Sequence, residues 1–328
     1  MPTPFVFALL ALLAFSASPA VAQNDSVIRI DGSSTVYPIS TEAARRYGRR
    51  DDITKIEVKF SGTTAGFRRF CAGETDISDA SRPINREELA KCESNKVKFI
   101  ELPIAFDAIA IVVNGENKWA NDISVAELKT LWEPAADGKV TTWKQVRAGW
   151  PDRPIKLFGR GQDSGTYDYF TSVIVGKTRA SRKDYTASEN EQVLVDGVMN
   201  EPGGLAFFGV GGYFRNWEEL KNLGIKTEEG VTYPSLEAVR AGKYQPLARP
   251  LFLYVNAERA KAKSGVNSLN VFVTDYISNL RRWVHFTGYM PLTPDTYARV
   301  LKHFTAGKEG TAFGGELQVG ARIEDVFK

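Results

Sequence analysis

The chain has 328 residues, of which 43% are hydrophobic and 25% are charged, and its formal net charge is +3. This near balance of charge makes nucleic acid and anionic membrane surfaces poor candidates as partners. Two histidines and two cysteines are few for a transition-metal site, so we expect neither a metal nor an organic cofactor.

The N-terminus is typical of a signal peptide. Residues 1–22 carry no charged side chain, contain an apolar run over residues 5–15, and end in the small-residue pattern Ala20-Val21-Ala22. The usual basic segment before the run is missing, and the run is too short to span a bilayer comfortably. We therefore predict a secreted or periplasmic protein with a mature chain of about 300 residues, enough for two ordinary domains.

The first part of the mature chain shows one local pattern twice. A predicted strand over Val27–Ile30 is followed by the hydroxyl-rich turn 31–35 and by apolar residues at helical spacing from Val36 to Tyr47. A second predicted strand, Lys55–Phe60, leads into the loop 61–66 (Ser-Gly-Thr-Thr-Ala-Gly) and another helix. Serine and threonine are favoured helix N-caps, so ordinary capping could explain either turn alone.

The two cysteines, Cys71 and Cys92, fit one local disulfide in an oxidising compartment, closing a loop of about 20 residues. Two buried free thiols are the alternative.

A third copy of the strand, loop and helix pattern lies in the middle of the chain. The strand Ile155–Phe158 leads into loop 159–166 (Gly-Arg-Gly-Gln-Asp-Ser-Gly-Thr), and a helix is predicted from Tyr167. Free N–H groups at a helix start bind anions, and glycine lets a ligand approach the backbone. Arg160 adds a charged donor fork that matches a tetrahedral oxyanion. Three such loops together indicate that they converge on one anion.

The remaining periodic segments predict further helices and strands. Residues 133–154, rich in proline, glycine and tryptophan, are predicted to be an irregular surface connection. Helices are expected at 85–92, 125–132, 189–199, 235–241, 271–284 and 294–304, and strands at 97–104, 108–114, 205–208 and 250–256.

Two almost wholly apolar strands, Ala108–Asn114 and Pro250–Asn256, divide the chain into a beginning, a middle and an end. Strands that alternate with helices indicate an α/β fold. We predict a middle lobe, residues 107–251, inserted into a discontinuous lobe of residues 23–106 and 252–328, with the two strands as a hinge. Ligands in such folds bind at the carboxyl ends of strands, so closure of the lobes would trap the anion.

Taken together, these segments resemble the periplasmic phosphate-binding proteins of phosphate ABC importers, the PstS-type family. The resemblance rests on four motifs in order, at residues 32–38, 61–67, 76–84 and 160–166, and covers nearly the whole mature chain. It implies a type II periplasmic-binding-protein fold with inorganic phosphate hydrogen-bonded in the cleft between the lobes. It also implies a monomer that delivers phosphate to the membrane permease of the importer.

Carried over by position, the resemblance assigns phosphate-binding roles to residues of all three loops. The first loop would contribute Ser34, Thr35 and the amide of Val36, and the second would contribute Thr64, with Ser61 as the alternative. The third would contribute Arg160, the Ser164 hydroxyl, the Gly165 amide and Thr166.

One position departs from the family pattern. Many members carry a carboxylate that accepts a proton from phosphate where this chain has Ser81. We include Ser81 in the predicted site and expect Asp79 or Asp163 to supply the negative charge, although Asp163 could instead fix Arg160. The next residue, Arg82, either contacts phosphate or is a surface charge before a turn proline.

Other functions fit parts of the sequence. A secreted phosphatase would need a nucleophile and a base, but Gln162 breaks the Gly-x-Ser-x-Gly frame around Ser164, and both histidines lie far along the chain. The glycine-rich loop also lacks the Lys-Ser/Thr pair of a nucleotide P-loop. A receptor for another oxyanion, such as sulfate, molybdate or a phosphonate, stays open as the alternative, and so does an added sensor role.

Overall fold

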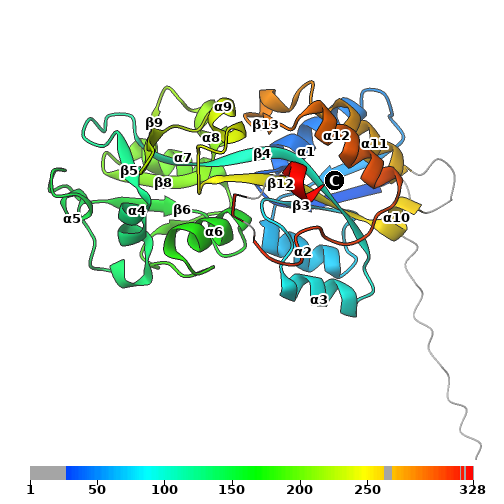
Figure 1. Ribbon diagram of the computed structural model, residues 1–328, viewed down its shortest axis with the longest axis horizontal. Coiled ribbons are helices and arrows are strands. Elements are labelled where there is room, and N and C mark those ends of the chain that lie inside the picture. Colours follow the sequence, from blue (N-terminus) through cyan, green and yellow to red (C-terminus); the bar gives the residue numbers. More distant parts are fainter. Residues whose placement is uncertain (1–26, 262–267, 318, 321–322, 328) are drawn as a thin grey trace, which may run out of the picture.

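The protein has two α/β lobes that lie side by side along the long axis of the molecule (Figure 1). The computed structural model describes residues 27–261, 268–317, 319–320 and 323–327. The predicted signal peptide lies outside the described residues. The predicted α/β class and the two-lobed architecture are confirmed. Within the described ranges, no helix is both long and apolar enough to cross a membrane.

Lobe I opens with three strand–helix units. Strand β1 pairs in parallel with both β2 and β3, so the three strands end at the same edge of the sheet. The disulfide between Cys71 and Cys92 is present and ties the second helix to the third. The units are β1 (Val27–Gly32) with α1 (Tyr37–Tyr47), β2 (Lys55–Val58) with α2 (Thr63–Cys71), and β3 (Ile77–Ala80) with α3 (Arg86–Ser94).

Two long strands connect the lobes, β4 (Phe99–Asn114) and β12 (Ala248–Asn256), and they pair antiparallel with each other. The sequence predicted two separate strands, 97–104 and 108–114, where the structure has one. The strand is continuous because β12 pairs with it from Phe99 to Ala108, across the predicted junction. Figure 1 shows both strands running from one lobe into the other.

Lobe II is built on β4, β8 and β6, with β8 antiparallel to β4 and parallel to β6. The prediction of an irregular surface connection over residues 133–154 is wrong in part. This segment contains a short helix, and its Trp143 is fully buried with Trp150 against it, because the two indoles complete the apolar core of the lobe. The elements are β5 (Asp122–Ser124), α4 (Val125–Trp132), η1 (Pro134–Ala136), α5 (Trp143–Val146), β6 (Lys156–Gly159), α6 (Gly165–Phe170), η2 (Thr171–Val175), β7 (Thr186–Ala187), α7 (Glu191–Asn200), β8 (Gly204–Gly209), α8 (Val210–Arg215), β9 (Leu220–Asn222), β10 (Gly224–Thr227), β11 (Gly230–Thr232) and α9 (Leu236–Arg240).

The chain then returns to lobe I and covers it with helices (Figure 1). One buried apolar cluster draws on residues 108–248 and Met290, and two others draw on residues 28–105 and 251–327. The clusters support our proposal of lobe boundaries at 106/107 and near 251/252, with Leu251 itself packed in a cluster of lobe I. The returning elements are α10 (Ala257–Lys261), α11 (Ser268–Leu280), η3 (Val284–Thr287), β13 (Met290–Pro291), α12 (Pro294–Thr305) and α13 (Ile323–Val326).

Candidate functional site

Hydroxyl groups from both lobes meet at one buried point between them. The Oγ1 atoms of Thr35, in lobe I, and Thr166, in lobe II, are 3.2 Å apart. In lobe I, Thr63 Oγ1 lies 3.2 Å from Ser81 Oγ and accepts a hydrogen bond from the Ser81 amide. Gly165 of lobe II packs against this second pair, since a Cβ there would lie 2.5 Å from Thr63 Oγ1 and 2.7 Å from Ser81 Oγ. All of these residues are buried, so the three loops do converge.

Local hydrogen bonds hold the loops in shape. Ser33 Oγ accepts from the amides of Thr35 and Val36, at 3.2 and 3.4 Å, and Ser164 Oγ caps α6 by accepting from the Thr166 amide at 3.1 Å. Gly32 has a φ of 133°, and a Cβ there would lie 2.2 Å from the Asp79 carbonyl oxygen. Only glycine fits this turn. Sequence reasoning predicted Thr35, Val36, Ser164 and Thr166 but missed Ser33 and Thr63.

Arg160 is fully buried in lobe II and has a protein partner. Its Nη2 lies 2.5 Å from Glu191 Oε2 and its Nη1 donates to the Glu189 carbonyl at 2.8 Å, while Nε has no partner. Burial raises the pKa of the Glu189 carboxyl to about 7, against the opposing pull of Arg160. Ser34 lines a small surface pocket with the same glutamates. Neither Glu189 nor Glu191 was recognised in the sequence.

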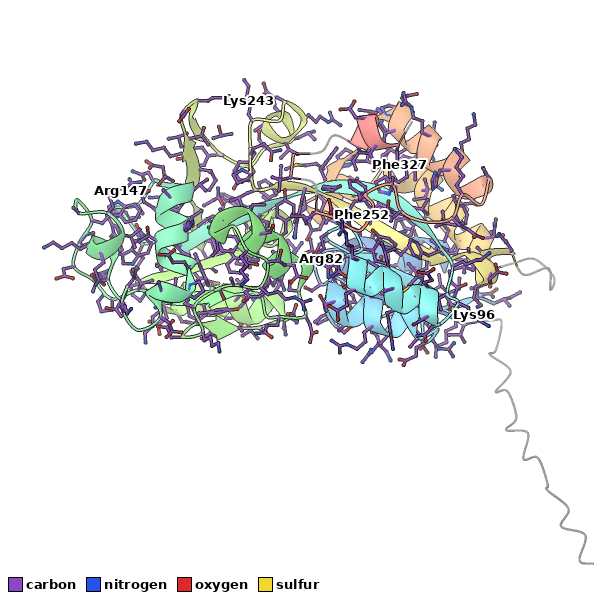
Figure 2. All side chains as sticks on the ribbon, turned by 60° about the horizontal axis from the view of Figure 1, so that its bottom comes forward. Arg82, Lys96, Arg147, Lys243, Phe252 and Phe327 are labelled. Atoms are coloured by element: carbon purple, nitrogen blue, oxygen red, sulfur yellow. A yellow bond between two sulfur atoms is a disulfide. The ribbon has the colours of Figure 1, made fainter. Side chains whose placement is uncertain are left out.

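Arg82 lies where the two lobes meet (Figure 2). Its five N–H groups are matched by five protein acceptors. Nε donates to Asp168 at 2.8 Å, Nη1 to the Pro83 carbonyl and Glu88, and Nη2 to Thr64 and Glu88. In this conformation the guanidinium therefore has no N–H group left to donate to an anion. The alternative prediction, that Arg82 is a surface charge before a turn proline, is wrong, because the side chain is only 4% exposed.

Thr64 belongs to the same cluster rather than to the point where the other hydroxyls meet. Its Oγ1 accepts from Arg82 and from Arg179, each at 2.9 Å. Asp168, two residues after Thr166, bonds both arginines, and it carried no signal in the sequence. The cluster thus joins Arg82 and Thr64 of lobe I to Asp168 and Arg179 of lobe II.

The two carboxylates expected to supply negative charge each have a protein partner. Burial raises the pKa of the Asp79 carboxyl well above its ordinary value, and Asp79 Oδ1 accepts a hydrogen bond from Ser40 Oγ under the first loop. Asp163 is 47% exposed and pairs with Arg68 across the lobes at 2.9 Å, not with Arg160. These contacts do not test whether either carboxylate faces the anion, so the expectation stays a prediction for both Asp79 and Asp163.

Comparisons with known proteins identify the family of the chain. A family model described as a PBP superfamily domain matches residues 17–276. The chain is 44% identical over 319 residues to Protein SphX of Synechocystis sp.. This match covers 97% of this chain and 94% of that protein. It is 34% identical over 275 residues to the phosphate-binding protein PstS of Staphylococcus haemolyticus, with 83% of each chain covered.

Among solved structures, the crystal structure of a possible phosphate binding protein from Planctomyces limnophilus DSM 3776 is similar, with a TM-score of 0.61 and 34% identity. The match covers 86% of this chain and 98% of that chain. Fold and site thus define a two-lobed binding protein of the PBP superfamily. The chain belongs to the PstS-type family of phosphate-binding proteins.

Proposed function

We propose that this protein captures inorganic phosphate between its lobes in the periplasm and delivers it to the permease of a phosphate ABC importer. The observation that carries the proposal is the convergence of Thr35, Thr63, Ser81 and Thr166 with Gly165 at one buried point. The membership in the PstS-type family supports phosphate as the anion.

The hydroxyl pairs suit an anion chemically. A hydroxyl has one proton to donate. In each of the pairs Thr35–Thr166 and Thr63–Ser81, one hydroxyl donates its proton to the oxygen of the other. An oxyanion between the pairs would accept all of these protons. The Gly165 amide is the proposed backbone donor of the third loop. The Val36 amide is the proposed donor of the first loop, and it would exchange its bond to Ser33 Oγ for one to the anion.

Within the predicted set, we assign different roles to the two arginines. Arg160 supplies positive charge, since its Nε is buried without a partner. Arg82 and Thr64 act through the cluster that joins the lobes, because protein groups already occupy the donors of Arg82. Ser34 is the proposed residue of the first loop nearest to the surface.

Isothermal titration of the mature protein with phosphate, sulfate, molybdate and a phosphonate tests the proposal. We expect phosphate to bind most tightly. Replacing Arg160 with Ala should weaken phosphate binding at least tenfold, since a hydrogen bond to a charged group contributes about 1.5–3 kcal/mol.

The matched control is Arg147→Ala, which removes another lobe II arginine that pairs with Asp122 and Glu127 outside the site. Equal affinities in the Arg160 and Arg147 variants would contradict the role of Arg160. No binding of any oxyanion by the wild type would contradict the function itself.

We also infer that the protein is not a phosphatase. The Ser164 hydroxyl caps α6, and the two histidines pack elsewhere, His285 against Phe286 and His303 against Phe327. A serine nucleophile needs a base within hydrogen-bond reach. Turnover of a chromogenic phosphate ester by the purified protein would contradict this inference.

A further inference from the structure

The hinge carries a buried ion pair that none of the anion-binding motifs includes. Asp107 on β4 and Arg249 on β12 are direct partners in the strand register, and both side chains have 0% exposed surface. Arg249 Nη2 and Nε lie 2.8 and 3.1 Å from Asp107 Oδ2. The residues are 142 positions apart in the chain, so only the pairing of the two strands brings them together.

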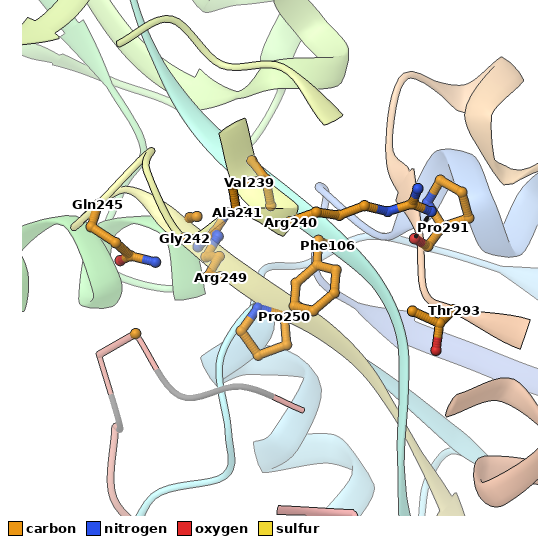
Figure 3. Close-up of a pocket in the computed structure, with 12 residues that line it drawn as sticks. Phe106, Val239, Arg240, Ala241, Gly242, Gln245, Arg249, Pro250, Pro291 and Thr293 are labelled. Carbon is orange, nitrogen blue, oxygen red and sulfur yellow. Dashed lines mark hydrogen bonds between the residues drawn. The ribbon is translucent and has the colours of Figure 1, made fainter. Parts of the chain in front are cut away.

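The ion pair faces the third loop. Side chains alternate along a strand, so the neighbours Phe106 and Pro250 point to the opposite face. Phe106 and Pro250 line a cavity of about 370 Å³ beside the hinge, which Arg249 also lines, and the Arg240 side chain extends to the Pro291 carbonyl (Figure 3).

The guanidinium of Arg249 holds two consecutive residues of the third loop. Its Nη2 donates to Thr166 Oγ1 at 2.7 Å, and its Nη1 donates to the Gly165 carbonyl at 3.2 Å. The Thr166 hydroxyl has a single proton. Because Arg249 donates to its oxygen, that proton is free to point toward Thr35, 3.2 Å away, or toward an anion between the lobes.

The carboxylate side of the pair is equally well held. Asp107 Oδ1 accepts from the Val210 amide at 3.2 Å. The preceding residue, Gly209, approaches both Asp107 and Thr35, since a Cβ at this glycine would lie 3.2 Å from Asp107 Oδ1 and 3.1 Å from the Thr35 methyl group. Arg249 therefore bonds the third loop directly at Thr166, and Asp107 approaches the first loop at Thr35 through Gly209.

We propose that Arg249 is a positioning residue of the anion site, which orients the Thr166 hydroxyl as a donor and adds positive charge at the floor of the cleft. Asp107 fixes the guanidinium and at the same time reduces its attraction for an anion. The two residues of one ion pair thus act on anion binding with opposite sign. This proposal rests on the proposed phosphate-binding function.

The opposite signs give a test that a purely structural role would not pass. Arg249→Met and Asp107→Asn both break the ion pair, and both are expected to lower the melting temperature. Titration with inorganic phosphate should show binding weakened about 10- to 100-fold by Arg249→Met, the loss of a charge-assisted hydrogen bond. Asp107→Asn should raise the affinity, because the Asn oxygen can still accept from Arg249 and hold the guanidinium, while a negative charge near the anion is removed.

Two further measurements complete the experiment. If Arg249→Met does not fold, Arg249→Gln replaces it. Thr166→Val is combined with the Arg249 variant, and the losses should be less than additive, since one residue acts through the other. Arg182→Met is the control, because the guanidinium of this buried lobe II arginine donates to Leu131, Val140 and Asp184, which lie outside the site.

Either of two results would overturn the proposal. One is phosphate affinity unchanged by the Arg249 substitution. The other is a similar loss in the Arg249 and Asp107 variants, which would mean that the pair only maintains the hinge. A wild type that binds no phosphate would instead contradict the proposed function on which this inference depends.

Discussion

A buried ion pair between the lobes should hold the protein in its closed form. Arg82 of lobe I and Asp168 of lobe II are 4% and 2% exposed, and the Arg82 Nε lies 2.8 Å from Asp168 Oδ2. Each has a second partner within its own lobe, Glu88 for Arg82 and Arg179 for Asp168. The bond between the lobes can therefore break on opening without leaving a buried charge alone. We expect Asp168→Asn to weaken phosphate binding by destabilising the closed form.

The size of the effect follows from the contacts that change. A hydrogen bond to a charged group contributes about 1.5–3 kcal/mol. The Asn carbonyl can still accept from Arg82, so we expect the closed form to lose about 1–2 kcal/mol. That corresponds to a rise in Kd of roughly 5- to 30-fold, since 1.4 kcal/mol is a factor of ten. The rise in Kd should appear mainly as faster dissociation of phosphate, because the Arg82–Asp168 contact forms only after the lobes have closed.

Asp163→Asn provides the matched control. Asp163 also pairs with an arginine across the lobes, Arg68, but the two side chains are 47% and 66% exposed. Exposed ion pairs contribute about 0–1 kcal/mol. Stopped-flow release of phosphate gives the dissociation rate, and small-angle scattering with and without phosphate reports closure.

The comparison of the two variants decides the question. Dissociation should be clearly faster for Asp168→Asn than for Asp163→Asn, and scattering should show a smaller closed fraction. If both variants release phosphate at the wild-type rate, or if both change equally, the buried pair does not control closure.

Two further predictions concern stability. Replacing Cys71 and Cys92 by Ala should lower the free energy of unfolding in urea by about 3 kcal/mol, because the bridge spans 21 positions; an unchanged midpoint would contradict this. The raised pKa of Glu189, about 7 against an ordinary value of 4.5, means that ionising this carboxyl costs stability as pH rises through that interval. Glu189→Gln should therefore melt at the wild-type temperature near pH 4 and at a higher temperature than the wild type near pH 8. If the variant and the wild type melt at the same temperature at pH 8 as well, ionisation of Glu189 does not destabilise the protein.

The sequence alone determined the local strand–loop–helix units of this protein. Strand, loop and helix follow one another within a dozen residues, so periodicity and capping chemistry predicted the loops around Thr35, Thr64 and Thr166. The two hinge strands were also predicted from local sequence, because each is an almost wholly apolar run. The disulfide was expected because both cysteines lie close together in the chain, and it is present.

Tertiary structure alone decided how the charged groups are partnered. Arg82 looked like a candidate donor, yet Asp168 and Glu88 engage it, and Asp107 meets Arg249 across 142 positions. No periodicity or motif encodes such pairs, because an ion pair requires only that two side chains meet in the folded chain. Strand pairing brings Asp107 to Arg249, and the docking of one lobe on the other brings Asp168 to Arg82.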